Sequence, residues 1–202
     1  MKKLSPLLSI ILLNIIPIIG VLLLGWNVYQ LITIFLLESV LVGVFNLVKM
    51  ALAKKPSLDT GIIKAFSKIG LMLFFCFHYF FFLLILSVFV FTMVVPADHI
   101  GLSNLNFILI IIMLFAGCTS HFITDYMLPK KYLTTAPGDL FFSPYSRVWI
   151  LAALIFAGGF ISHNRMGNQY FYLIILVSTK LFADIVVFLF SNYVSLNKAR
   201  TK

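Results

Sequence analysis

The chain has 202 residues, of which 62% are hydrophobic and only 10% are charged. Soluble domains contain roughly 45–50% apolar and about 25% charged residues, so this composition excludes an ordinary soluble domain and indicates an integral membrane protein. The formal net charge of +9 is compatible with nucleic-acid binding, but the positions of the basic residues argue against that class.

Six segments are long and apolar enough to cross a bilayer, which takes about 20 mostly apolar residues per helix. The expected spans are 6–24, 26–48, 69–95, 105–127, 148–162 and 169–192. No stretch remains for a soluble domain, so residues 1–202 are expected to form a single all-α domain, a transmembrane bundle of six helices. Trp26 lies between the first two spans and is expected to anchor that turn at the membrane interface.

The basic residues lie at alternate ends of the six spans. Thirteen of the fifteen Lys and Arg residues fall on one side, the other side holds only Arg165, and Lys180 lies within a span. The positive-inside rule therefore predicts that both termini are cytoplasmic, with residues 128–147 as the longest cytoplasmic loop. We expect the basic residues to contact anionic membrane lipids rather than nucleic acid. So small a bundle, with several faces of small residues, also predicts a homo-oligomer.

Polar and ionisable side chains lie inside the apolar spans. A charge in hydrocarbon costs at least about 2.5–3.5 kcal/mol on insertion scales, so such residues usually face a bundle interior or a water-filled cavity. The candidate functional residues are Glu38, Asn46, His78, His121, Asp125, Lys180 and Asp184. Four different spans contribute ionisable members of this set to one layer in the inner half of the membrane.

Several of these candidates also have a structural interpretation. Lys180 and Asp184 are four residues apart, so they share a helical face and can neutralise each other. Glu38 has no opposite charge within its own span, so it is either protonated or reaches Lys180 or a histidine across the bundle. Asn46 lies on the same side of its helix as Gly43, a pattern that usually marks a close helix contact.

The same residues allow a metal site. His121 and Asp125 are four residues apart, so they can share a metal, or the carboxylate can orient the imidazole. Together with Glu38 and His78 they form a plausible ligand set for zinc or iron. No signature such as HExxH supports this interpretation further.

Several groups of residues match a known pattern in order and spacing across five spans. They are Leu37-Glu38 through Gly43, Asn46 and Lys49, His78-Tyr79, Ser120-His121, Pro144-Tyr145 with Arg147, Gly158-Gly159-Phe160, and Lys180 with Asp184. On these residues the chain resembles a prokaryotic family of uncharacterised multi-span membrane proteins, a domain of unknown function. The resemblance implies a helical fold in a prokaryotic plasma membrane, and it implies no activity. Family members often have a histidine where this chain has Ala152, which argues against a metal site of three histidines.

Three classes of function stay open. In the leading hypothesis the chain is a small transport or permeation protein whose inward-facing polar cavity handles protons or a small solute. The residues expected to line that cavity are Glu38, His78, His121, Lys180 and Asp184. The alternative is an intramembrane enzyme that uses a metal to activate water against a lipid or another hydrophobic substrate. The third class is a scaffold or assembly protein whose buried charges only fix the helix register.

Overall fold

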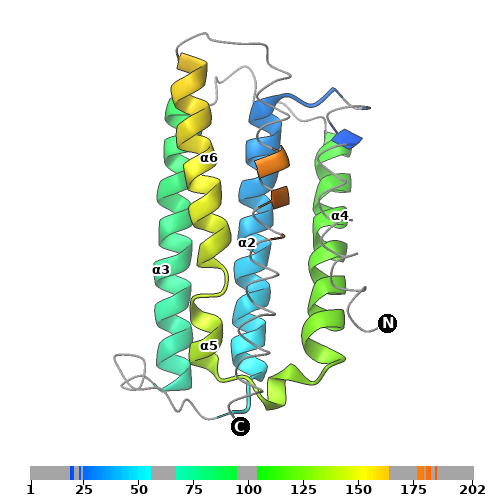
Figure 1. Cartoon of the computed structure of the whole chain (residues 1–202), viewed down its shortest axis with the longest axis vertical. Coiled ribbons are helices and arrows are strands. Elements are labelled where there is room, and N and C mark those ends of the chain that lie inside the picture. Colours follow the sequence, from blue (N-terminus) through cyan, green and yellow to red (C-terminus); the bar gives the residue numbers. More distant parts are fainter. Residues whose placement is uncertain are drawn as a thin grey trace.

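The computed structural model describes residues 19, 20, 23, 25–55, 67–94, 104–163, 177–179, 181, 182 and 185. Within these residues the ordered elements are all helical (Figure 1). The α-helices are α2 (Val28–Leu52), α3 (Lys68–Phe89), α4 (Asn104–Phe122), α5 (Pro137–Phe141) and α6 (Tyr145–His163). The all-α expectation is confirmed for the part of the chain that is described.

Three helical segments are long and apolar enough to cross a membrane. They are Tyr29–Leu52, Lys68–Thr92 and Phe107–Met127, close to the expected spans 26–48, 69–95 and 105–127. The expectation of six spans is therefore supported only in part, since the described residues show three and not six. The expected fifth span, 148–162, lies within α6, and the expected spans 6–24 and 169–192 lie largely outside the described residues.

The turn before α2 is encoded by the local sequence. Gly25 has a φ of +64°, a left-handed conformation that glycine adopts without a steric penalty. Asn27 then caps the helix: its side chain accepts the backbone N–H of Gln30 at 2.9 Å, and the Gln30 side chain accepts the backbone N–H of Asn27 at 3.0 Å. This reciprocal capping satisfies donors that have no partner within the helix.

Trp26, expected to anchor this turn at the membrane interface, is buried by the protein. The residue is only 5% exposed, its backbone N–H donates to the carbonyl oxygen of Gly20 at 3.0 Å, and its ring lies directly against that glycine. The absence of a side chain at Gly20 allows this close approach, so the indole packs inside the turn.

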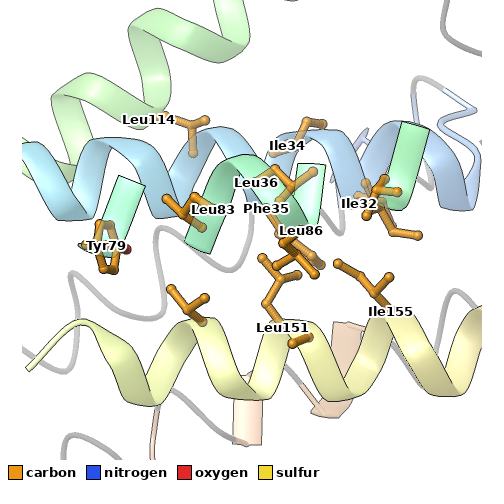
Figure 2. Packing of buried hydrophobic residues seen from close by; sticks show 14 of the residues in the cluster. Ile32, Ile34, Phe35, Leu36, Tyr79, Leu83, Leu86, Leu114, Leu151 and Ile155 are labelled. Atoms are coloured by element: carbon orange, nitrogen blue, oxygen red, sulfur yellow. The ribbon is translucent and has the colours of Figure 1, made fainter. Parts of the chain in front are cut away.

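α2 is the central helix of the described bundle. It lies between the α3–α6 pair and α4 in Figure 1, it contacts all of these helices, and it is the most buried of the three candidate spans. Figure 2 shows hydrophobic side chains from these elements packed against one another. It labels Ile32, Ile34, Phe35 and Leu36 of α2, Tyr79, Leu83 and Leu86 of α3, Leu114 of α4, and Leu151 and Ile155 of α6. Helices in lipid are held together by such close packing, because lipid tails are as apolar as the side chains themselves.

Gly43 allows α2 and α3 to approach closely. A Cβ atom at this position would overlap the ring of Tyr79, which is fully buried. The hydroxyl of Tyr79 donates to the carbonyl oxygen of Ser39 at 2.9 Å, one turn before the glycine. The close helix contact expected beside Gly43 is confirmed, and it places Tyr79 against the backbone of α2.

Replacing Gly43 by Ala should destabilise the protein, because the new methyl group must displace the Tyr79 ring. Overpacking of this kind typically costs about 1–3 kcal/mol. We expect a lower midpoint of thermal unfolding in detergent, whereas Val44→Leu, at a 43% exposed position of the same turn, should leave the midpoint unchanged. An equal midpoint for wild type and Gly43→Ala would contradict the close contact.

Candidate functional site

The buried Glu38 forms an ion pair with Arg147, whose side chain is 23% exposed. Glu38 lies within α2 and is 6% exposed, and its Oε1 lies 3.7 Å from Nη1 of Arg147 in the first turn of α6. At about 1.5 Å of rise per residue, Glu38 lies roughly 21 Å from the Leu52 end of α2. Lys180 and the histidines were the partners considered from the sequence, and the structure instead brings a guanidinium to this carboxylate.

Arg147 reaches this depth because α6 begins well inside the bundle. After α4 the chain turns at Lys130, which has a φ of +54°, forms a short 3-10 turn at Lys131–Leu133, and then enters α5. α5 packs against both α2 and α3, and α6 starts above it (Figure 1). α5, in the second half of the expected loop 128–147, is therefore packed against other helices, which the sequence did not predict.

Asn46 binds this entering segment. It is 4% exposed, and its Nδ2 donates to the carbonyl oxygen of Leu140 at 3.0 Å. Asn46 lies about 9 Å from the Leu52 end of α2. Backbone that leaves a helix at membrane depth is tolerated only where protein or water satisfies its polar groups. The side chain of Asn46 performs this role, so its position among small residues is explained by a specific hydrogen bond.

A second polar centre lies at the end of α4. Nε2 of His121 is 3.0 Å from Oδ2 of Asp125, which belongs to the π-helical turn Ile123–Met127. π-helical turns are rare and frequently occur at functional sites. Oδ1 of Asp125 is buried and has no hydrogen-bond partner among the described residues. This oxygen can accept a proton, a water molecule or a small cation.

Lys49 connects this centre to α2. Its ammonium lies 5.8 Å from the centre of the Tyr126 ring, and the Tyr126 hydroxyl donates to the carbonyl oxygen of Lys49 at 2.8 Å. These two contacts hold the end of α4 against α2 beside Lys49.

His78 lies on a different surface. Its side chain is exposed on α3, its Nδ1 is 2.7 Å from the hydroxyl of Tyr145, and its ring stacks on Phe74 at 5.7 Å. The expectation that His78 shares a cavity with Glu38 and His121 is not met by the described residues. Lys180 and Asp184, expected in the same cavity, lie outside the described residues.

The four residues considered for zinc or iron are not gathered into one site. Glu38 is paired with Arg147, His78 with Tyr145, and His121 with Asp125. In the part of the chain that is described, no group of three or more His, Cys, Asp or Glu residues could hold a metal ion. The described geometry therefore lends no support to a metal-dependent enzyme.

Two partners were not anticipated from the sequence, Arg147 and Tyr145. Both follow Pro144 at the start of an apolar segment, where a basic residue ordinarily marks the cytoplasmic end of a span. One feature of the sequence could have indicated Arg147 as the partner of Glu38. A carboxylate in an apolar span needs a cation, and Arg147 directly precedes an apolar run. Nothing in the local pattern shows that this helix begins deep in the bundle.

These features define a class of protein: an all-helical chain with long apolar helices that bury an ion pair, as is typical of integral membrane proteins. The chain belongs to the family of unknown function DUF6498, whose profile matches residues 1–201. This confirms the resemblance to an uncharacterised family. Comparisons with curated proteins and with solved structures found no match.

Removing either partner of the Glu38–Arg147 pair should destabilise the fold, because the other charge loses its ion-pair partner. Breaking a buried pair typically costs about 3–5 kcal/mol. We expect Glu38→Gln and Arg147→Met each to lower the thermal midpoint in detergent, and the double variant to be less destabilised than the sum of both. Additive losses would show that the two side chains do not interact.

Replacing Asn46 by Leu should loosen the segment before α6, because the hydrogen bond to Leu140 is lost. One such bond contributes about 0.5–1.5 kcal/mol. We expect faster tryptic cleavage after Lys130 and Lys131 than in wild type. Val48→Leu, at a 40% exposed position of the same helix, is the matched control. Equal cleavage rates for the Asn46 variant and wild type would contradict this role.

Proposed function

We propose that the protein is a small transport or permeation protein of the plasma membrane whose buried polar interior handles protons or a small solute. In this proposal it has six helical spans with both termini cytoplasmic, which the distribution of Lys and Arg supports. Membrane lipids surround its apolar faces, and a second copy of the chain covers part of them in a homo-oligomer.

The buried Glu38–Arg147 pair is the observation that carries this proposal. Glu38 belongs to a helix long and apolar enough to cross a membrane, and the pair lies between α2 and α6. Ionisable residues at such positions commonly mark ion pathways and proton relays. Apolar side chains of similar volume would often stabilise a helix contact as well as a buried ion pair does, so packing alone does not require these charges.

A polar stripe on α2 supports a route to this pair. Lys49, Asn46 and Glu38 are separated by three and eight residues, so they lie on one side of the helix. Over this distance the helix rises about 17 Å. At the Lys49 end lie His121 and Asp125, whose buried Oδ1 has no hydrogen-bond partner among the described residues. Titratable groups therefore lie at both ends of the stripe: His121 and Asp125 beside Lys49, and Glu38 at the other end.

Proteoliposomes with an internal pH dye test the proton form of this proposal. Under an imposed pH gradient, wild type should dissipate the gradient faster than protein-free vesicles. Glu38→Gln should slow this flux by about tenfold or more, because an amide cannot carry a proton in a relay of ionisable groups. Asp139→Asn, which changes an exposed carboxylate in α5, should behave as wild type.

Two outcomes would contradict the proposal. Wild-type flux equal to that of protein-free vesicles would exclude proton permeation. Unchanged flux in correctly folded Glu38→Gln would exclude Glu38 as a proton-carrying group, and it would favour a scaffold in which the pair only fixes the helix register.

A further inference from the structure

The chain between α4 and α6 forms a strap that lies against α2 and α3. The strap (residues 131–141) comprises the 3-10 turn and α5, and α5 contacts both helices (Figure 1). Near its start, the backbone N–H of Lys54 donates to the carbonyl oxygen of Tyr132 at 2.8 Å. Near its end, Asn46 donates to the carbonyl oxygen of Leu140 at 3.0 Å. Hydrogen bonds from α2 and the residue that follows its end therefore hold the strap near both of its ends.

Phe141 is the apolar anchor of the strap. Its side chain is 5% exposed. The ring stacks on Phe74 at 5.7 Å, meets Phe75 edge-on at 5.8 Å and stacks on Tyr145 at 5.8 Å between ring centroids. Phe74 and Phe75 belong to α3, and Tyr145 is the first residue of α6. Since aromatic pairs in these arrangements add to the stabilisation from burial, Phe141 holds the strap against α3 and against the start of α6.

The end of the strap leads directly to the ion pair. Leu140 contacts Asn46, and Arg147, seven residues later, contacts Glu38. Asn46 and Glu38 are eight residues apart, about 12 Å along α2, so the chain between Leu140 and Arg147 follows α2 from one contact to the other. Both α2 side chains are buried, at 4% and 6% exposure. The strap therefore covers Asn46 and continues into the turn of α6 that carries Arg147.

Both ends of the strap are suited to act as hinges. Lys130, directly before it, has a φ of +54°, a left-handed conformation that is strained for a residue other than glycine. After it, residues 142–144 form a turn that ends in Pro144, which has no backbone N–H to donate. α5 itself has five residues, too few for a helix that is stable alone. The order of the strap therefore depends on its contacts with α2, α3 and α6.

We propose that the strap is a cover that opens as a unit about its two ends and so controls access to the Glu38–Arg147 pair. The structure describes the closed form. Opening breaks the hydrogen bond from Asn46 and withdraws Phe141 from the rings of α3. Segments held by few contacts between hinge positions open without unfolding the helices around them. The purpose of the opening rests on the proposed function, whereas the opening itself is tested without any measurement of flux.

Two buried alanines allow the opening to be measured by thiol labelling. Ala136, the N-cap residue of α5, is 3% exposed, and Ala152 in α6 is 4% exposed. Each is replaced by Cys in full-length protein whose native Cys76 and Cys118 are changed to Ala, and the rate of reaction with N-ethylmaleimide is measured in detergent. We expect Ala136→Cys to react about tenfold faster or more than Ala152→Cys, because only the first position lies in the strap.

Loosening the strap should raise the labelling rate in the strap alone. Asn46→Leu removes a hydrogen bond and Phe141→Leu removes the ring contacts. Each should accelerate the labelling of Ala136→Cys by about tenfold and leave that of Ala152→Cys unchanged. Leu133→Ala, at a 48% exposed position of the 3-10 turn, is the matched control and should change neither rate. The thermal midpoint of each variant checks that it has folded.

A third reporter tests access to the ion pair itself. Glu38→Cys is combined with Arg147→Met, so that neither charge is left without its partner. Phe141→Leu should accelerate labelling at position 38 by the same factor as at position 136, because one opening exposes both. The assay needs no proton flux, so a wild type that conducts no protons would contradict the proposed function and leave this result intact.

Three results would overturn the inference. Equal labelling rates for Ala136→Cys and Ala152→Cys would show that the strap opens only when the whole bundle does. Equal acceleration at both positions by Asn46→Leu and by Phe141→Leu would show a general loss of stability. Faster labelling at position 136 with an unchanged rate at position 38 would show that the strap opens without controlling access to the pair.

Discussion

A carboxylate and a guanidinium buried between α2 and α6 constrain the middle of this bundle. Once Glu38 is placed within an apolar helix, its cation must arrive at the same depth, and Arg147 does so because α6 begins at Tyr145. The chain before α6 must then rise among the helices, which exposes backbone carbonyl groups to an apolar interior. The side chain of Asn46 donates to one of these groups, the carbonyl oxygen of Leu140.

The polar groups fall into two environments. Glu38, Arg147 and Asp125 are largely enclosed by protein, where charges are compensated by partners or by bound water and protons. His78 instead shares an aromatic surface with Tyr145 on the outer side of α3 and α6. Glu38 and His78 thus have different neighbours although both lie near the middle of their helices. The position of a residue along its helix does not by itself show which site it belongs to.

Much of the helical framework was predictable, because uninterrupted apolar runs of more than 20 residues specify helices in lipid whatever their neighbours. The runs that became α2, α3 and α4 were identified within a few residues at each end. The contact at Gly43 was also readable, since a missing side chain allows close approach. Helix rotation was not predictable, because helices apolar on all sides show no preferred face. The burial of Trp26 and the contact of His78 with Tyr145 were therefore not predicted.

By itself the sequence determined the apolar helices, the uncharacterised family and the list of polar residues that require an explanation. The tertiary structure alone decided which of them meet. Asn46 and Leu140 are 94 residues apart, and the Glu38–Arg147 pair also joins residues that are distant in the sequence. Such pairing depends on the depth at which each helix starts, and that depth follows from how residues 128–144 pack against α2 and α3. No local pattern encodes this packing, because it arises only when the helices are assembled.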